Sequence, residues 1–205
     1  MGAYLREVGL DEVGRGAWAG PVVVGAARGD RGAIAEVLAS RHGVLRDSKA
    51  LSPAGRQRAL RALHEQGAAI ALGCASAAEV DLLGLRAALA LAARRALAQA
   101  QLGSWDLVVL DGSDPYVTGV PVRCVVGGDR SDPLVAAASV AAKVARDAMM
   151  EEFALRWPCY GFDRHKGYGT ALHRAALVRW GPCPQHRRSV APVSALLDDY
   201  VCRST

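Results

Sequence analysis

Residues 105–112, Trp-Asp-Leu-Val-Val-Leu-Asp-Gly, form the clearest strand in the sequence. The apolar run at 107–110 indicates a strand buried on both faces, as the inner strands of α/β sheets are. The run ends on a carboxylate, and the following glycine permits a turn. Because ligands bind beyond the carboxyl ends of such strands, Asp111 is the first candidate for a functional residue.

The pattern on either side of this strand predicts further strands and helices. Ser52 before Pro53 is typical of a helix start, and Ser76 with Glu79 has the spacing of a capping box. No linker or repeat interrupts the order, so we expect one α/β domain with a mixed sheet. Strands are expected at 4–10, 21–27, 68–75 and 122–126, and helices at about 53–66, 76–102, 133–157 and 171–180.

Composition narrows the class of protein. The 205 residues, 51% of them hydrophobic, suffice for one substantial core, and the net charge of +5 favours a polyanionic partner. Five scattered cysteines without a Cys-x-x-Cys pair favour a reducing compartment, so we expect a cytoplasmic protein. The longest apolar stretch, residues 17–27, is too short to cross a bilayer, so neither a membrane segment nor a signal peptide is expected.

Acidic side chains recur where strands are expected to end. Asp11 and Glu12 follow the first strand, Asp111 ends the central one, and Asp129 comes shortly after another. Taken singly, each acid could equally be a solvated loop residue. Together at one edge of a sheet they would repel one another unless a cation neutralised them, and hard oxygen ligands suit Mg²⁺ or Mn²⁺. Such a site beside a basic surface is suited to phosphodiester hydrolysis.

Two further segments are suited to holding a nucleotide. Gly14-Arg15-Gly16 offers bare backbone amides and a positive charge immediately after the first acids. The segment from His165 to Thr170, His-Lys-Gly-Tyr-Gly-Thr, offers a cation, an aromatic ring and closely approaching backbone. The alternative interpretations are an ordinary turn and a structural loop.

Two other kinds of site are possible. Ser139 and Lys143 are four residues apart on an expected helix and could form a nucleophile–base pair, although the flanking alanines favour a packing face. A zinc module could draw on two cysteines and two histidines, although their spacing matches no compact zinc finger: Cys159, His165, Cys183 and His186.

Taken in order, several motifs resemble those of ribonuclease HII along nearly the whole chain. They are Gly9-Leu-Asp-Glu-Val-Gly-Arg-Gly16, Asp47-Ser-Lys-Ala-Leu-Ser52, Asp111-Gly112, Gly128-Asp129, Ala136-Ala-Ala-Ser-Val-Ala-Ala-Lys-Val-Ala-Arg-Asp147, His165-Lys-Gly-Tyr-Gly-Thr170 and His186-Arg187. The resemblance implies a single catalytic domain over residues 1–205 with an RNase H-like fold. That fold is a five-stranded mixed sheet flanked by helices, with a helical C-terminal extension at roughly 171–205.

The resemblance also implies a metal-dependent endonuclease. It would hydrolyse the RNA strand of RNA–DNA hybrids and cut 5′ of ribonucleotides embedded in duplex DNA, with water as nucleophile, leaving 5′-phosphate and 3′-hydroxyl ends. Its catalytic, metal-binding acids would be Asp11, Glu12, Asp111 and Asp129, with Mn²⁺ or Mg²⁺ as cofactor. A monomer is expected. Its substrate contacts would be Gly14, Arg15 and Gly16 at the ribose hydroxyl, Tyr168 at the following deoxyribose, and Lys49 and Lys166 at the nucleic acid.

The chain departs from the usual pattern of this family at several positions. Gly127 stands where many relatives have lysine, and Val190 where phenylalanine is common. Asp147 is an alternative fourth carboxylate, but Asp129 is preferred because Asp147 lies on a long expected helix beside Arg146. A hybrid-binding protein without activity is the remaining interpretation. The presence of all four acids favours an enzyme.

Overall fold

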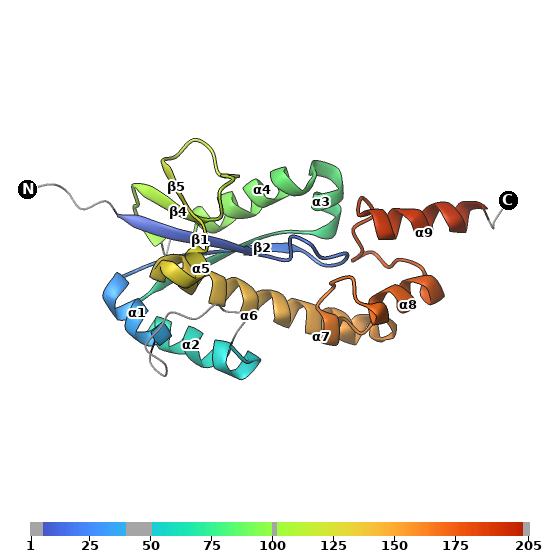
Figure 1. Cartoon of the computed structure of the whole chain (residues 1–205), viewed down its shortest axis with the longest axis horizontal. Helices are drawn as coiled ribbons and strands as arrows, with labels where there is room; N and C mark the ends of the chain where they lie inside the picture. The colour runs from blue at the N-terminus through green and yellow to red at the C-terminus, as the bar shows by residue number, and fades with distance from the viewer. Residues whose placement is uncertain (1–5, 40–50, 100–101, 203–205) are drawn as a thin grey trace, which may run out of the picture.

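A five-stranded mixed sheet forms the centre of the protein (Figure 1). The computed structural model describes residues 6–39, 51–99 and 102–202. Strands β1, β2 and β3 pair antiparallel, whereas β4 and β5 continue the sheet in parallel with β1. The expected five-stranded mixed sheet is therefore confirmed. In sheet order its strands are β3 (Ala69–Ala75), β2 (Val22–Arg28), β1 (Glu7–Val13), β4 (Leu107–Asp111) and β5 (Val122–Val125).

Helices cover both faces of the sheet (Figure 1). One face packs against α4 (Leu85–Leu97), which contacts α3 (Ala77–Leu83), and the other against the long helix α6 (Pro133–Arg156). Helices α1 (Arg31–Ala39) and α2 (Pro53–Glu65) flank α6. The remaining helical segments are α5 (Gly128–Ser131), a 3-10 turn (Pro158–Tyr160), α7 (Phe162–His165), α8 (Ala171–Trp180) and α9 (Ala191–Cys202).

Side chains of β1 alternate between the two faces of the sheet, so that Asp11 lies on the face covered by α6. Val8 and Leu10 join the core beneath α4, whereas Asp11 faces α6. Helix α6 lies directly on the sheet backbone: a Cβ added at Gly9 would lie 2.3 Å from the carbonyl carbon of Leu134. At Gly25, the β2 partner of Asp11, it would lie 2.2 Å from the carbonyl oxygen of Ala138. Glycine is needed at both points.

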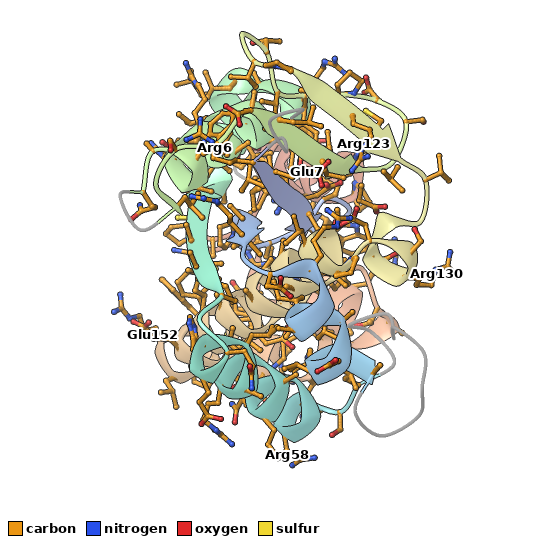
Figure 2. All side chains as sticks on the ribbon, turned by 90° about the vertical axis from the view of Figure 1, so that its left-hand side faces the viewer. Arg6, Glu7, Arg58, Arg123, Arg130 and Glu152 are labelled. Atoms are coloured by element: carbon orange, nitrogen blue, oxygen red, sulfur yellow. The ribbon has the colours of Figure 1, made fainter. Side chains whose placement is uncertain are left out.

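Charged side chains connect the amino end of β1 to its surroundings. Glu7 accepts a hydrogen bond from Arg123 on β5 (Nη2–Oε1, 2.8 Å), and Figure 2 shows these two side chains close together. Arg31 on α1 pairs with both Glu7 and Asp132, and the Asp132 side chain caps the first turn of α6. Since both arginines are partly exposed, each pair contributes only modestly to stability.

Several boundaries differ from the sequence prediction. Strand β1 extends to Val13 because its ladder with β2 continues through Asp11 and Glu12, so these two acids lie within the strand rather than after it. The helical region expected over 76–102 is divided into α3 and α4 at Gly84, where φ is +76°. The expected helices at 53–66, 133–157 and 171–180 are present as α2, α6 and α8.

Replacing Gly25 by alanine should separate α6 from the sheet. The new methyl group would meet the Ala138 backbone, which cannot move without the helix. Overpacking of this kind costs about 1–3 kcal/mol, and we expect urea unfolding to show a loss of that size in the free energy of unfolding. Gly16→Ala is the matched control, because a Cβ added there has no atom within 4 Å, and it should not destabilise the protein. Parental stability of Gly25→Ala would contradict the close packing.

Candidate active site

The parallel pairing of β1 with β4 brings two of the predicted acids side by side. Leu10 is opposite Leu110, so Asp11 and Asp111 are the next residues along two adjacent strands. Glu12 follows in β1. The backbone N–H of Gly128 donates to Oδ1 of Asp111 (2.7 Å), which brings the start of α5, and with it Asp129, to the same edge. All four predicted acids therefore lie at one edge of the sheet.

Asp11 is a buried member of this group. Burial, followed by the negative charges of Glu12 and Asp111, raises the pKa of Asp11 to about 7. The Ser139 hydroxyl of α6 and the N–H of Glu12 oppose this shift because they donate hydrogen bonds to the carboxylate. The pKa of Asp11 is thus set by desolvation, hydrogen bonds and neighbouring negative charges, and a bound cation would supply a positive charge that favours the ionised form.

The donor set fits a divalent cation, although the side chains do not yet converge on one. Carboxylate oxygens are the ligands that Mg²⁺ and Mn²⁺ prefer. Within the three described ranges, no three acidic, histidine or cysteine side chains are already arranged around a point where one ion could bind. Asp111 faces the N–H of Gly128 instead, and Glu12 faces Tyr116 and Arg15.

Tyr116 is a contact of the site that sequence reasoning missed. It belongs to the loop after β4, is buried, and donates from its hydroxyl to Oε2 of Glu12 (3.0 Å). Burial, followed by the charges of Glu12 and Asp11, raises the pKa of Tyr116 well above its usual value, so the phenol remains a donor. Arg15 pairs with the other oxygen of Glu12 (Nη1–Oε1, 3.3 Å). Glu12 is thus held between a buried phenol and the turn that follows β1.

Residues 14–21, here called the Gly14 turn, follow the acids of β1 in the chain, and Arg15 and Gly16 are the exposed residues within it. Gly14 has a φ of +92°, and a Cβ added there would lie 2.3 Å from Nε of Arg146. The Cβ position at Gly16 has no atom within 4 Å and faces open space. The Arg15 side chain is 54% exposed. A ligand approaching this turn would meet Arg15 and Gly16 first.

Residues 165–170, here called the Tyr168 loop, lie against the Gly14 turn. The N–H of Trp18 donates to the carbonyl of Gly167 (2.8 Å), and a Cβ at Gly167 would lie 2.3 Å from the Ala19 oxygen. The Tyr168 ring is partly exposed and lies 5.4 Å from the guanidinium carbon of Arg146. The two predicted substrate segments are therefore adjacent, although about 150 residues separate them in sequence.

The two predicted lysine contacts have different outcomes. Nζ of Lys166 pairs with Oε1 of Glu151 (2.7 Å), and the lysine side chain is 17% exposed, so its charge is engaged within the protein. Lys49 lies outside the described residues.

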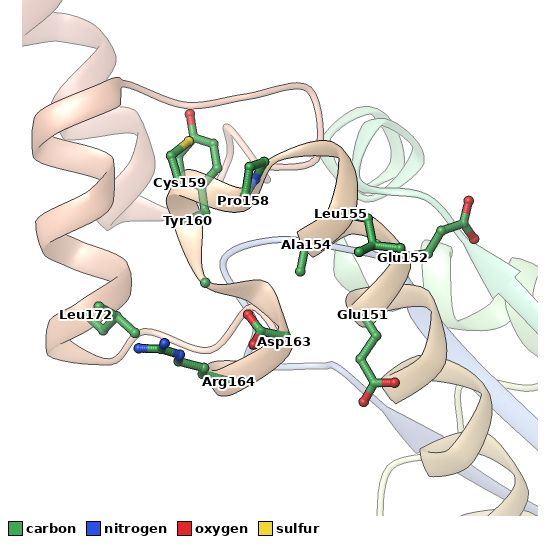
Figure 3. Close-up of a pocket in the computed structure, with 11 residues that line it drawn as sticks. Glu151, Glu152, Ala154, Leu155, Pro158, Cys159, Tyr160, Asp163, Arg164 and Leu172 are labelled. Carbon is green, nitrogen blue, oxygen red and sulfur yellow. The ribbon is translucent and has the colours of Figure 1, made fainter.

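A hollow of about 760 Å³ lies away from the acids, between the end of α6 and the start of α8 (Figure 3). Its walls include Glu151, Leu155, Asp163 and Leu172, and none of the four predicted acids. The acids instead lie at the carboxyl ends of β1 and β4 and at the start of α5.

Comparison with known protein families gives one match along most of the chain. The family model for ribonuclease HII matches residues 8–193. The chain belongs to the ribonuclease HII family. It is 47% identical over 192 residues to the ribonuclease HII of Halorhodospira halophila, covering 93% of this chain and 94% of that protein. It is 48% identical over 190 residues to a ribonuclease HII of Thermus thermophilus, covering 93% and 88%.

Solved structures of related proteins have the same fold. The ribonuclease HII chain in the PCNA complex from Archaeoglobus fulgidus matches with a TM-score of 0.74 and 22% identity, covering 94% of this chain and 99% of that one. Bst-RNase HIII in complex with Mn²⁺ matches with a TM-score of 0.70 and 23% identity, covering 95% and 70%. The predicted RNase H-like fold is thereby confirmed.

The contacts of the side chains involved do not support the serine–lysine dyad or the zinc module that the sequence allowed. Nζ of Lys143 pairs with Oδ1 of Asp147 (2.5 Å), while Ser139 hydrogen-bonds Asp11, so a serine–lysine dyad is not formed. Asp147 is also paired with Arg56 (3.2 Å), which supports Asp129 as the fourth acid. The ring nitrogens of His165 and His186 bond to the protein, and no zinc-binding group exists in the described parts of the chain.

Three buried imidazoles support the Tyr168 loop of this ribonuclease HII family member, a grouping that the sequence did not reveal. His165 and His173 stack with ring centroids 4.3 Å apart. Nε2 of His173 lies 3.0 Å from Nε2 of His186, and Nδ1 of His173 lies 3.0 Å from the Tyr168 carbonyl.

The hydrogen bonds of His173 and His186 fix where their protons lie. Because the carbonyl can only accept, we assign the His173 proton to Nδ1, and His186 then donates from Nε2. Nδ1 of His186 can then accept from the N–H of Cys183 (3.0 Å). Both rings must be neutral for this chain of hydrogen bonds.

Lowering the pH should reduce the contribution of His173 and His186 to the stability of the folded protein. Burial lowers the pKa of His173 and of His186 to about 4, whereas an unfolded histidine titrates near pH 6.5. Their stabilising contribution is therefore complete above about pH 6.5 and is lost as the pH falls towards 4. The raised pKa of Asp11 acts in the opposite direction, so a variant must be compared with the parent.

We expect the destabilisation caused by His173→Gln, measured by urea unfolding, to be smaller at pH 4.5 than at pH 7.5. His64→Gln, on the exposed side of α2, is the control and should follow the parent at both pH values. A His173→Gln penalty that is the same at both pH values would contradict the neutral, buried state of the ring.

Proposed function

We propose that Asp11, Glu12, Asp111 and Asp129 bind the divalent cations with which this ribonuclease HII family member cleaves its substrates. The chain is a metal-dependent endonuclease that cleaves RNA in RNA–DNA hybrids and at embedded ribonucleotides. The observation that carries the site assignment is the parallel register of β1 and β4, which puts a buried carboxylate with a raised pKa beside a second acid.

Bound Mg²⁺ or Mn²⁺ would polarise the phosphate and lower the pKa of water. The protein's part is to present the carboxylates. Ser139 holds Asp11, the N–H of Gly128 holds Asp111, and Tyr116 holds Glu12. We propose that water is the nucleophile and that the cut falls 5′ of the ribonucleotide, leaving 5′-phosphate and 3′-hydroxyl ends.

The Gly14 turn and the Tyr168 loop are proposed to recognise the substrate. Gly14, Arg15 and Gly16 would bind the ribose 2′-hydroxyl, and the exposed Tyr168 ring would pack on the following deoxyribose. Lys49 and Lys166 are proposed nucleic-acid contacts, the second after release from Glu151.

We further propose that the protein acts as a monomer. In the described ranges, no helix is both long enough and apolar enough to span a membrane.

Asp111→Asn should nearly abolish cleavage of a labelled DNA duplex that carries one ribonucleotide. The charge stabilisation from bound metal is worth several kcal/mol, so we expect a loss of more than about 100-fold in kcat with either Mg²⁺ or Mn²⁺. Binding of the uncleaved duplex should remain measurable. The parent should be inactive when a chelator is added.

Asp114→Asn is the matched control, because Asp114 lies three residues further along and pairs with Arg86 at the surface. It should cleave like the parent. Asp111→Asn with undiminished cleavage would refute the assignment of Asp111. Cleavage by the parent in the presence of chelator would refute the metal requirement itself.

A further inference from the structure

Two buried arginines lie beneath the Gly14 turn and the Tyr168 loop. Arg146, on α6, is fully buried, and Arg187, which precedes α9, is 1% exposed. In the described part of the chain, the hydrogen bonds of both guanidinium groups go to backbone carbonyls and none goes to a carboxylate. A buried cation is tolerated only where its donors are well satisfied. The carbonyl positions are therefore tied to these two side chains.

Arg146 joins the turn to the loop. Its Nε donates to the Pro21 carbonyl (2.9 Å) and its Nη2 to the Ala19 carbonyl (3.1 Å), both in the Gly14 turn. Its Nη1 donates to the Lys166 carbonyl (2.8 Å) in the Tyr168 loop, and the Tyr168 ring lies against the same guanidinium. Because a guanidinium is planar and rigid, one group fixes the spacing between the two segments.

Arg187 holds the Gly14 turn from another point. Its Nε donates to the Gly20 carbonyl (3.0 Å) and its Nη1 to the Arg15 carbonyl (3.2 Å). Its backbone N–H donates to the Trp18 carbonyl (2.8 Å). Nη2 of Arg187 is buried and has no partner among the described residues. Nε and Nη1 of Arg187 therefore hold the turn that carries Arg15, whereas Nη2 forms no hydrogen bond with a described residue.

We propose that Arg146 and Arg187 are positioning residues that set the distance between the proposed ribose contacts and Tyr168. Neither side chain is exposed enough to touch the substrate. The inference rests on the proposed roles of the Gly14 turn and of Tyr168, and it concerns selectivity rather than chemistry. A ribonucleotide followed by a deoxyribonucleotide is recognised only if both contacts are correctly spaced. A misplacement of about 1 Å can cost about 100-fold.

The test measures selectivity of binding, so that it does not depend on turnover. In an Asp111→Asn background, fluorescence anisotropy gives the Kd for a labelled DNA duplex with one ribonucleotide and for the same duplex made only of DNA. We expect Arg146→Lys and Arg187→Lys each to reduce the ratio of these two affinities by about tenfold, because lysine keeps the charge but cannot hold several carbonyls in one plane.

Arg56→Lys is the matched control. Arg56 is also buried, and its bonds to the Leu51 carbonyl (2.6 Å) and to Asp147 on α6 (3.2 Å) lie outside the Gly14 turn and the Tyr168 loop. It should lower stability in urea and leave the affinity ratio unchanged. This separates a positioning role from a general loss of stability, which would affect both duplexes equally.

The outcomes distinguish the two proposals. An unchanged ratio in folded Arg146→Lys and Arg187→Lys would overturn the positioning role while leaving the proposed function intact. Equal affinity of the background protein for both duplexes would overturn the proposed ribose recognition, and the positioning role with it. If Arg146→Lys does not fold, the ratio for Arg187→Lys decides, because Arg187 holds the same turn.

Discussion

The direct contact of α6 with the sheet backbone positions both parts of the candidate site. At Gly9 and Gly25 no side chain separates the helix from β1 and β2. The helix therefore lies close enough for Ser139 to reach Asp11 and, further along, for Arg146 to reach the Gly14 turn. A side chain at either glycine would displace the helix and disturb both contacts at once. The proposed metal site and the proposed substrate contacts thus depend on the same packing.

The charges of the site are unbalanced in two places, in opposite senses. At the edge of the sheet, acids crowd together and the pKa of Asp11 rises to about 7. Beneath the substrate segments, desolvation lowers the pKa of both Arg146 and Arg187, and each guanidinium is surrounded by carbonyl dipoles. We propose that a metal cation from solution balances the first charge, whereas backbone carbonyls partly balance the second. The carbonyl contacts of the two arginines are present before any ligand binds.

Much of the fold could be predicted because its signals are local. The apolar run that ends in Asp111, the capped starts at Ser52 and Ser76, and the long helix from 133 are present as expected. The position of Asp11 within β1 was not predicted, because the ladder with β2 continues past the apolar residues.

The contacts that support the site were harder to predict because they join distant segments. Tyr116 reaches Glu12 across 104 residues, and Arg187 reaches Gly20 across 167. No periodicity or spacing records such a pairing. The group of His165, His173 and His186, in which only the first two rings are stacked, likewise joins residues from separate segments. Local pattern therefore predicted the acids as candidates, and only the structure showed which residues contact them.

The most direct test of this account is to locate Mn²⁺ by anomalous X-ray scattering in crystals of the protein with a hybrid duplex, using Asp129→Asn to prevent turnover. The account predicts at least one Mn²⁺ about 2.0–2.6 Å from carboxylate oxygens of both Asp11 and Asp111, a range typical of hard divalent ions. Mn²⁺ bound elsewhere, with both carboxylates facing only protein donors, would contradict it.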